Sequence, residues 1–216
     1  MNEPNRKRKN EISYSIILNE EQKLAKKLIE ENQLVIITGR AGSGKTLVAA
    51  LTALDFLQKK MTGAIMISRA AIEVGKTLGH LPGDLSDKFD PYMEAVKDNL
   101  YKCTSKEKID QYVKENRILA VPVQFVRGKT VDDVLIVDES QNLTKHEMLA
   151  LLTRLGKTGK IIITGDNEQR DIKDAYNGLT YAIELSKKIP EIQWVKLKEN
   201  HRSDLVGKIL DYEYNS

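Results

Sequence analysis

The sequence contains a single cysteine, Cys103, so it cannot form an intrachain disulfide. No His/Cys cluster surrounds this residue, which argues against a structural zinc site and leaves an ordinary thiol as the expectation. No stretch approaches the roughly 20 apolar residues that span a bilayer, and no apolar run of signal-peptide length follows the basic N-terminus. These absences predict a cytoplasmic protein without membrane contact, whose fold comes from a packed core.

Neither sign of charge is in large excess, because 34 Lys and Arg residues face 31 Asp and Glu residues and leave a net charge of +3. That balance is too mild to require a nucleic-acid partner. A compact basic run, Arg6 to Lys9, lies within residues 1–14, which we interpret as a flexible N-terminal tail. The run could contact a phosphate backbone, but a solvated tail explains it equally well.

What the sequence does contain is an alternation of short apolar runs with longer amphipathic segments. Near-continuous Val/Ile/Leu runs are typical of strands that helices cover on both faces, as in a parallel sheet. Six strands are predicted, at Leu34–Thr38, Ala64–Ser68, Ile118–Val121, Val134–Val137, Ile161–Thr164 and Gln193–Leu197.

Helical spacing of apolar residues predicts helices at Thr46–Lys60, Leu143–Leu155 and Gly178–Lys188, and Ser203 can cap a last helix. Residues 87–117 are charged and mostly helical in pattern, so we interpret them as an insertion. With right-handed crossovers, these elements predict one domain over residues 15–216. Its fold class is α/β, a three-layer α/β/α sandwich around a mostly parallel sheet.

A glycine-rich segment follows the first predicted strand and opens a helix, and this position suits a phosphate cradle. Glycines let the backbone N–H groups curl around the β-phosphate, Lys45 bridges the β- and γ-phosphates, and the Thr46 hydroxyl ligates Mg²⁺. The pattern predicts ATP binding. The residues expected to line the nucleotide here are Gly39, Arg40, Ala41, Gly42, Ser43, Gly44, Lys45, Thr46 and Leu47.

Two acids end the predicted strand Val134–Val137, at the edge where ligands bind in open α/β sheets. We expect Asp138 to hold the Mg²⁺, usually through water, and Glu139 to polarise the water that attacks the γ-phosphorus. Charged residues at the end of a strand are common by themselves. The glycine-rich phosphate cradle upstream, a P-loop pattern, favours the interpretation that these two acids act on a bound nucleotide.

Two glutamines are candidates for nucleotide contacts. Gln169, after the strand Ile161–Thr164, could sense the γ-phosphate and the attacking water, although Gly165-Asp166-Asn167 is also an ordinary turn sequence. Gln22 could present a donor and an acceptor to the adenine edge. The alternative for Gln22 is a role in a helix cap with Asn19 as the capping residue, and both roles can hold together.

Taken together, these residues resemble the PhoH-like ATPases, whose core is similar to the first motor domain of superfamily 1 helicases. The resemblance covers nearly the whole chain after about residue 15. Its most specific parts are the segments Arg69–Gly75 and Leu78–Asp84, followed by Lys88 and Asp90-Pro91-Tyr92. It implies a RecA-like fold, an Mg²⁺-dependent ATPase, contact with single-stranded RNA or DNA, and a ring-shaped homo-oligomer, with a hexamer as the expected form.

The sequence departs from this family at Ser140, where Ala is usual, and at Lys76, where an acid is common. The segment Leu197–Ser203 looks closer to the helicase motif whose arginine contacts the γ-phosphate, which makes Arg202 the first candidate for a catalytic arginine finger. Arg127 and Arg154 are the other candidates, for contact across a subunit interface. Each of the three could also be a solvated surface cation.

Two rival functions stay open at this point. A P-loop kinase would use the same cradle, but Glu139 and Gln169 stand where an attacking water is positioned, and no lid for an acceptor substrate is evident. A nucleotide-gated assembly module would need no strand-binding surface. The sequence does not separate this second rival from a nucleic-acid-dependent ATPase.

Overall fold

The computed structural model describes residues 16–69, 97–172, 176–199 and 212. Its centre is a six-stranded sheet with the order β3-β2-β4-β5-β1-β6, and every pairing is parallel. The strands are β1 (Leu34–Gly39), β2 (Ile65–Arg69), β3 (Ile118–Ala120), β4 (Val134–Asp138), β5 (Lys160–Gly165) and β6 (Ile192–Leu197).

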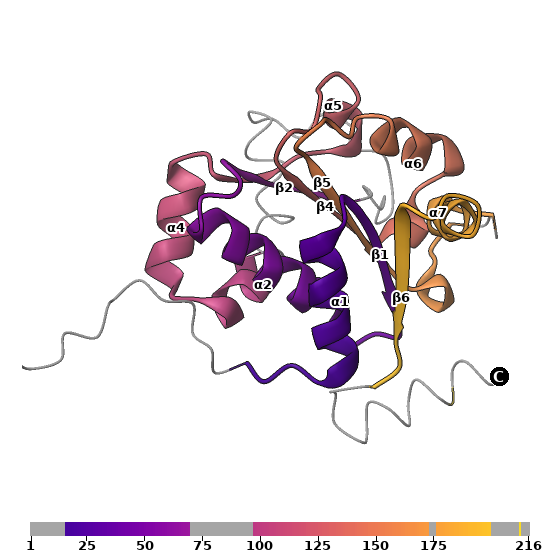
Figure 1. Cartoon of the computed structure of the whole chain (residues 1–216), viewed down its shortest axis with the longest axis horizontal. Helices are drawn as coiled ribbons and strands as arrows, with labels where there is room; N and C mark the ends of the chain where they lie inside the picture. The colour runs from indigo at the N-terminus through magenta and orange to yellow at the C-terminus, as the bar shows by residue number, and fades with distance from the viewer. Residues whose placement is uncertain (1–15, 70–96, 173–175, 200–211, 213–216) are drawn as a thin grey trace, which may run out of the picture.

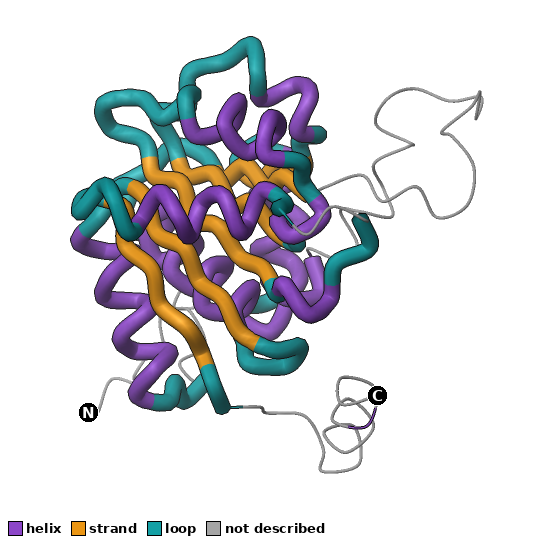
Figure 2. The backbone as a smooth tube through the Cα atoms, turned by 90° about the vertical axis from the view of Figure 1, so that its right-hand side faces the viewer, coloured by secondary structure: helices purple, strands orange, loops and turns teal. Residues whose placement is uncertain are grey.

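Helices cover both faces of this sheet, which gives three layers (Figure 1, Figure 2). One face carries the helices that pack with α2, and the other carries the helices around α6 and α7. The first group is α1 (Glu20–Glu31), α2 (Lys45–Gln58) and α4 (Lys106–Lys114), and the second is α5 (Val123–Val126), α6 (Lys145–Leu152) and α7 (Gly178–Ser186).

Strand β1 shows why the apolar runs are continuous. All six of its residues are buried. Val35 and Ile37 contribute to the core on the α2 face, whereas Leu34 and Ile36 contribute to the core on the α6 face. Because successive side chains of a strand point to opposite faces, a strand buried on both sides favours apolar residues at nearly every position.

The sequence-based assignment of elements is confirmed for the described residues. All six predicted strands are present, and the three predicted helices appear as α2, α6 and α7 with bounds that shift by at most three residues. The last predicted helix, capped by Ser203, lies outside the described residues.

The segment predicted to be an insertion is partly integral to the core. Its described part contains a helical stretch at 97–103 and helix α4. Leu100, Cys103 and Ile109 are fully buried in the cluster on the α2 face, so they help to cover the sheet. Burial also raises the pKa of the Cys103 thiol to about 12, which makes it the inert thiol expected from the sequence. No helix in the described residues is long and apolar enough to cross a membrane.

Candidate nucleotide-binding site

The glycine-rich loop joins the carboxyl end of β1 to the start of α2, as the sequence predicts. Gly39, Gly42 and Gly44 all have positive φ, at 155°, 85° and 87°. A Cβ on Gly39 would lie 2.4 Å from the main-chain oxygen of Leu197 in β6. Glycine is therefore required at position 39 by both the backbone conformation and the neighbouring strand.

Lys45, the first residue of α2, is buried beside this loop. Its Nζ donates hydrogen bonds to the main-chain oxygens of Gly39, at 2.6 Å, and Arg40, at 3.0 Å. These contacts hold a buried ammonium group along the loop whose glycines can approach a phosphate. The arrangement suits a multiply charged anion, because the loop amides and the ammonium are all donors.

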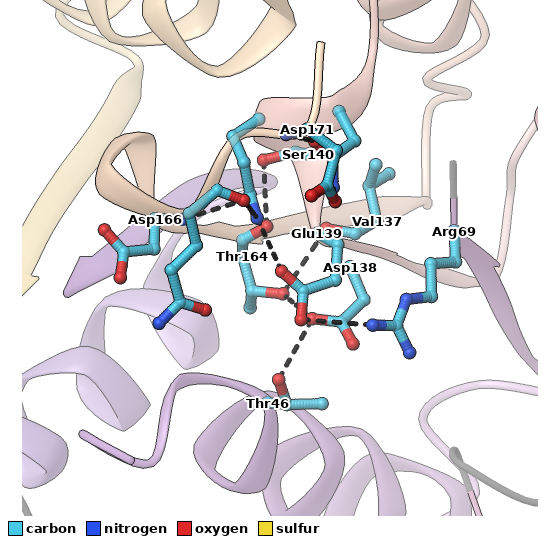
Figure 3. A network of polar contacts seen from close by, with 12 residues as sticks. Thr46, Arg69, Val137, Asp138, Glu139, Ser140, Thr164, Asp166 and Asp171 are labelled. Carbon is cyan, nitrogen blue, oxygen red and sulfur yellow. Dashed lines mark hydrogen bonds and ion pairs between the residues drawn. The ribbon is translucent and has the colours of Figure 1, made fainter. Parts of the chain in front are cut away.

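Thr46 and Asp138 come together as predicted for a Mg²⁺ site. The Thr46 hydroxyl donates to Oδ1 of Asp138 at 3.0 Å, and Thr164 on β5 donates to the same oxygen at 2.5 Å (Figure 3). Hydroxyl and carboxylate oxygens are ligands that Mg²⁺ prefers, and the ion usually needs only one or two protein ligands beside phosphates and water. The donor set therefore fits Mg²⁺. Among the described residues no group of three or more His, Cys, Asp or Glu forms a separate metal cluster.

Glu139 follows β4 and is held in a left-handed conformation, with φ 51° and ψ 43°. A non-glycine residue in this region carries strain that its surroundings must hold, and such residues cluster at functional sites. Two donors hold its carboxylate: Arg69 Nη2 at 3.2 Å from Oε1 and Gln141 Nε2 at 2.6 Å from Oε2. The carboxylate position is thus fixed by β2 on one side and by its own loop on the other (Figure 3).

Gln141 is a site residue that sequence reasoning missed. It is fully buried, its Oε1 accepts a hydrogen bond from the Asp166 amide at 3.0 Å, and its Nε2 also donates to the Gln169 main-chain oxygen at 3.2 Å. One side chain thereby connects Glu139 to the loop after β5. The polar run Ser140-Gln141-Asn142 after the two acids was the only sequence signal that could have indicated this role.

The loops after β4 and β5 are joined at two further points. The Ser140 hydroxyl donates to the Thr164 main-chain oxygen at 2.8 Å. Asn142 and Asp171 form a reciprocal pair, in which Asn142 Nδ2 donates to the Asp171 carboxylate at 3.1 Å and the Asp171 amide donates to Asn142 Oδ1 at 2.7 Å. A displacement of either loop would therefore move the other, and with it Glu139.

A cavity of about 450 Å³ collects most of the predicted residues at the carboxyl edge of the sheet. Gly39, Arg40, Ser43 and Asp138 were also predicted for the site but are not among its lining residues. It brings Lys45 and Thr46 of the loop and helix α2 together with Glu139 and Gln169, which come from the ends of two other strands. Its lining consists of Ile16, Ile17, Gln22, Ala41, Gly42, Gly44, Lys45, Thr46, Leu47, Asn99, Lys102, Glu139 and Gln169.

Gln22 performs the helix-cap role that was the alternative to an adenine contact. Its side-chain oxygen accepts from the Asn19 amide at 3.2 Å and its own amide donates to Asn19 Oδ1 at 2.8 Å, which makes a capping box for α1. Its Nε2 donates to the Ser43 main-chain oxygen at 3.0 Å, so it also supports the glycine-rich loop. Because Gln22 lines the cavity as well, an adenine contact stays a prediction.

Asp166, after β5, is a buried acid that faces away from Glu139 and Asp138 (Figure 3). Burial raises the pKa of its carboxyl above the ordinary value, while the Glu168 amide and the Lys45 ammonium oppose that rise.

Two of the three arginine candidates, Arg127 and Arg154, are among the described residues, and neither lines the nucleotide cavity. Arg154 Nη1 donates to the main-chain oxygen of Arg127 at 3.2 Å, and the Arg154 main-chain oxygen accepts from Val131, just before β4 begins. This pair therefore lies toward the amino edge of the sheet, away from the glycine-rich loop. Arg202 lies outside the described residues, as does most of the segment after Arg69 that carried the family resemblance.

The same fold occurs in solved motor domains. The structure is similar to the Pif1 helicase of Candida albicans, with a TM-score of 0.50 and 20% identity over 93% of this chain and 44% of that one. It is also similar to the large terminase of a thermophilic bacteriophage, with a TM-score of 0.51 and 9% identity over 89% of this chain and 49% of that one. At these identities the similarity shows the fold alone, a RecA-like α/β P-loop domain.

Sequence relatives are much closer. A PhoH-like protein of Bacillus subtilis is 38% identical over 187 residues, which are 85% of this chain and 59% of that protein. The protein PhoH of Escherichia coli is 35% identical over 170 residues, 77% of this chain and 48% of that protein. The chain thus spans between about half and three fifths of these relatives. The model of the PhoH-like protein family matches residues 16–213, and with the P-loop site above this shows that the chain belongs to that family of P-loop NTPases.

Proposed function

We propose that this chain is an Mg²⁺-dependent ATPase that couples hydrolysis to the binding or unwinding of RNA or DNA. One observation carries the hydrolytic half: a single cavity is lined by Lys45 and Thr46 of the phosphate cradle and by Glu139 and Gln169 from two neighbouring strand ends. Phosphate binding alone would need only the first two residues. Glu139 adds a carboxylate held by two donors beside the cradle.

In the proposed reaction, Lys45 and the loop amides bind the β- and γ-phosphates, and Thr46 with Asp138 holds the metal. Bound Mg²⁺ supplies positive charge that stabilises the charge developing on the phosphate oxygens. Glu139 accepts a proton from water while the water oxygen bonds to the γ-phosphorus and the bond from that phosphorus to the bridging oxygen of ADP breaks. Gln141 and Arg69 position Glu139 for this transfer.

The kinase alternative is less well supported, because a kinase must exclude water from the γ-phosphate and bind a second substrate. Here the base and Gln169 line the same cavity as the cradle. A nucleotide-gated assembly module without strand movement differs from the proposal only in its lack of response to nucleic acid.

We expect Lys45→Ala to weaken ATP binding roughly 10- to 150-fold, because hydrogen bonds to a charged group contribute about 1.5–3 kcal/mol each. Titration with a fluorescent ATP analogue measures this. Lys157→Ala, an exposed lysine in the turn before β5, is the matched control and should bind normally. Unchanged binding in Lys45→Ala would overturn the assignment of the cradle.

ATP turnover with and without single-stranded RNA or DNA, at a stated salt concentration, tests the second half of the proposal. Stimulation that declines with salt supports coupling to a strand. Normal turnover without any stimulation, together with no salt-sensitive binding, would favour the nucleotide-gated module.

We further propose a ring-shaped homo-oligomer, a hexamer, in which one of the three candidate arginines completes the site of a neighbouring subunit. Arg127 and Arg154 lie away from the nucleotide cavity of their own chain. Either residue would therefore reach a nucleotide only across an interface with a neighbouring subunit. Arg202→Ala subunits mixed with Glu139→Gln subunits should regain activity if Arg202 acts on a neighbour. No recovery at any ratio would favour an arginine finger that acts in cis, within its own subunit. A monomeric mass at micromolar concentration would contradict the ring.

We further propose that residues 15–216 form one ATPase domain and that the protein is cytoplasmic. The predicted N-terminal tail, residues 1–14, lies outside the described residues. Its basic run, Arg6 to Lys9, would add positive charge to the binding of a nucleic-acid strand.

A further inference from the structure

The edge strand β6 carries the single tryptophan of the chain in an exposed position. Trp194 is 42% exposed, although a large aromatic side chain on a sheet normally packs against neighbours. No proposed step of ATP hydrolysis uses it, and it does not line the nucleotide cavity. Its exposure therefore calls for a separate explanation.

The orientation of the indole is fixed. Trp194 Nε1 donates a hydrogen bond to the Thr38 hydroxyl on β1 at 2.9 Å. Val195 and Leu197, one and three residues further along the strand, are buried in the core on the α2 face. Because side chains alternate along a strand, Trp194 and Lys196 lie on the opposite face of β6, toward α7. The indole ring therefore has little conformational freedom to lose when a ligand binds to it.

A hollow of about 130 Å³ lies beside this ring and shares no lining residue with the nucleotide cavity. Two of its lining residues are cations, Lys196 and Arg40. Arg40 forms an ion pair with Glu168 at 3.1 Å. The hollow is lined by Thr38, Gly39, Arg40, Asp166, Asn167, Glu168, Ile183, Trp194 and Lys196.

We propose that this surface, which we name the β6 platform (Trp194, Lys196 and Arg40), binds single-stranded nucleic acid, with one base stacked on Trp194. The inference rests on the nucleic-acid half of the proposed function. A rigid aromatic ring flanked by cations matches what a single strand presents, a flat base beside a charged phosphate. Lys196 and Arg40 contact the phosphates next to the stacked base, and Glu168 is the competitor that a phosphate must displace from Arg40.

The β6 platform also gives a bound nucleic-acid strand a route to the nucleotide-binding site. Arg40 belongs to the glycine-rich loop, and Glu168 lies one residue before Gln169, which lines the nucleotide cavity. A nucleic-acid phosphate that binds Arg40 breaks its ion pair with Glu168. It would therefore act at the same time on the glycine-rich loop and on the loop after β5.

Intrinsic fluorescence tests the platform directly, because Trp194 is the chain's only tryptophan. Titration with a homopyrimidine oligonucleotide should quench the emission in a saturable, salt-dependent manner. An abasic oligonucleotide of the same length carries the phosphates without bases, and it should bind more weakly without quenching. Quenching by both oligonucleotides to the same extent would overturn the stacking contact.

Variants measured with a labelled oligonucleotide give a second test. Trp194→Ala should lower affinity by about tenfold or more, as expected for the loss of one stacked base, and Trp194→Phe should retain part of it. Lys196→Ala should reduce the slope of log affinity against log salt concentration by about 1, the value expected for the loss of one phosphate contact. Phe125→Ala, an exposed aromatic residue in α5 beyond the opposite edge of the sheet, is the matched control and should bind normally.

ATP turnover without nucleic acid separates this inference from the proposed function. Trp194→Phe and Lys196→Ala should hydrolyse ATP normally in that assay. Normal strand binding by both variants would overturn the platform while leaving the ATPase proposal intact. A blue shift of Trp194 emission that depends on protein concentration and not on oligonucleotide would also overturn it, because a second copy of the chain would then cover the ring.

Discussion

Glu139→Gln is expected to keep ATP bound and to lower turnover by about 10²–10⁴-fold, the usual contribution of a general base. The substitution preserves the size of the side chain, and its oxygen can still accept a hydrogen bond from Gln141 or Arg69. What it removes is the ability to take a proton from water. Single-turnover hydrolysis and nucleotide affinity, measured on the same preparation, separate the two effects.

Glu191→Gln is the matched control for this experiment. It makes the same chemical change at an exposed residue just before β6, and Glu191 does not line the nucleotide cavity. Its turnover without nucleic acid should stay close to that of the unmodified protein. A near-normal rate in Glu139→Gln would show that another group takes the proton, and the assignment of the base would then be wrong.

Gly39→Ala is expected to lower the free energy of unfolding by about 2–6 kcal/mol, the sum of backbone strain and overpacking. A Cβ at this position would lie 2.4 Å from the Leu197 main-chain oxygen and 2.7 Å from the Ser43 hydroxyl, at a φ of +155° that side chains rarely adopt. The change therefore forces β1 and β6 apart or distorts the loop. Denaturant unfolding without nucleotide measures the loss.

Gly128→Ala provides the corresponding control, because a Cβ there meets no heavy atom within 4 Å and the backbone has no positive φ. Its stability should stay unchanged or rise slightly, since alanine reduces the freedom of the unfolded chain. Equal unfolding midpoints for the two variants would contradict the close approach of β6 to the glycine-rich loop.

Much of the site was predictable because its residues follow strands. The glycine-rich loop that leads to Lys45 and Thr46 comes directly after one buried run, and Asp138 and Glu139 come directly after another. Parallel strands end at the same edge of a sheet, so residues that follow them must come close together. The observed contact between Thr46 and Asp138 at 3.0 Å is the result.

Other features of the site depended on contacts between distant segments, which the pattern of apolar residues along the sequence does not predict. In the sequence, Arg69 is only the first residue of the segment Arg69–Gly75 that carries the family resemblance, whereas the structure pairs it with Glu139. That pairing depends on β2 lying next to β4, in the register that places Arg69 beside Asp138. The two strands are separated by more than 60 residues of chain, so their adjacency is a property of the sheet order.

The sequence by itself determined the fold class, the phosphate cradle and the two acids, because each rests on a local pattern of strand, glycine turn and helix. Only the tertiary structure decided which donors hold Glu139, that Gln22 supports the glycine-rich loop, and that Leu100 and Ile109 belong to the core. It also decided that Trp194 remains exposed on β6. The physical reason is the same in each case: local patterns fix the backbone of a single element, whereas the neighbours of a side chain depend on how distant elements pack together.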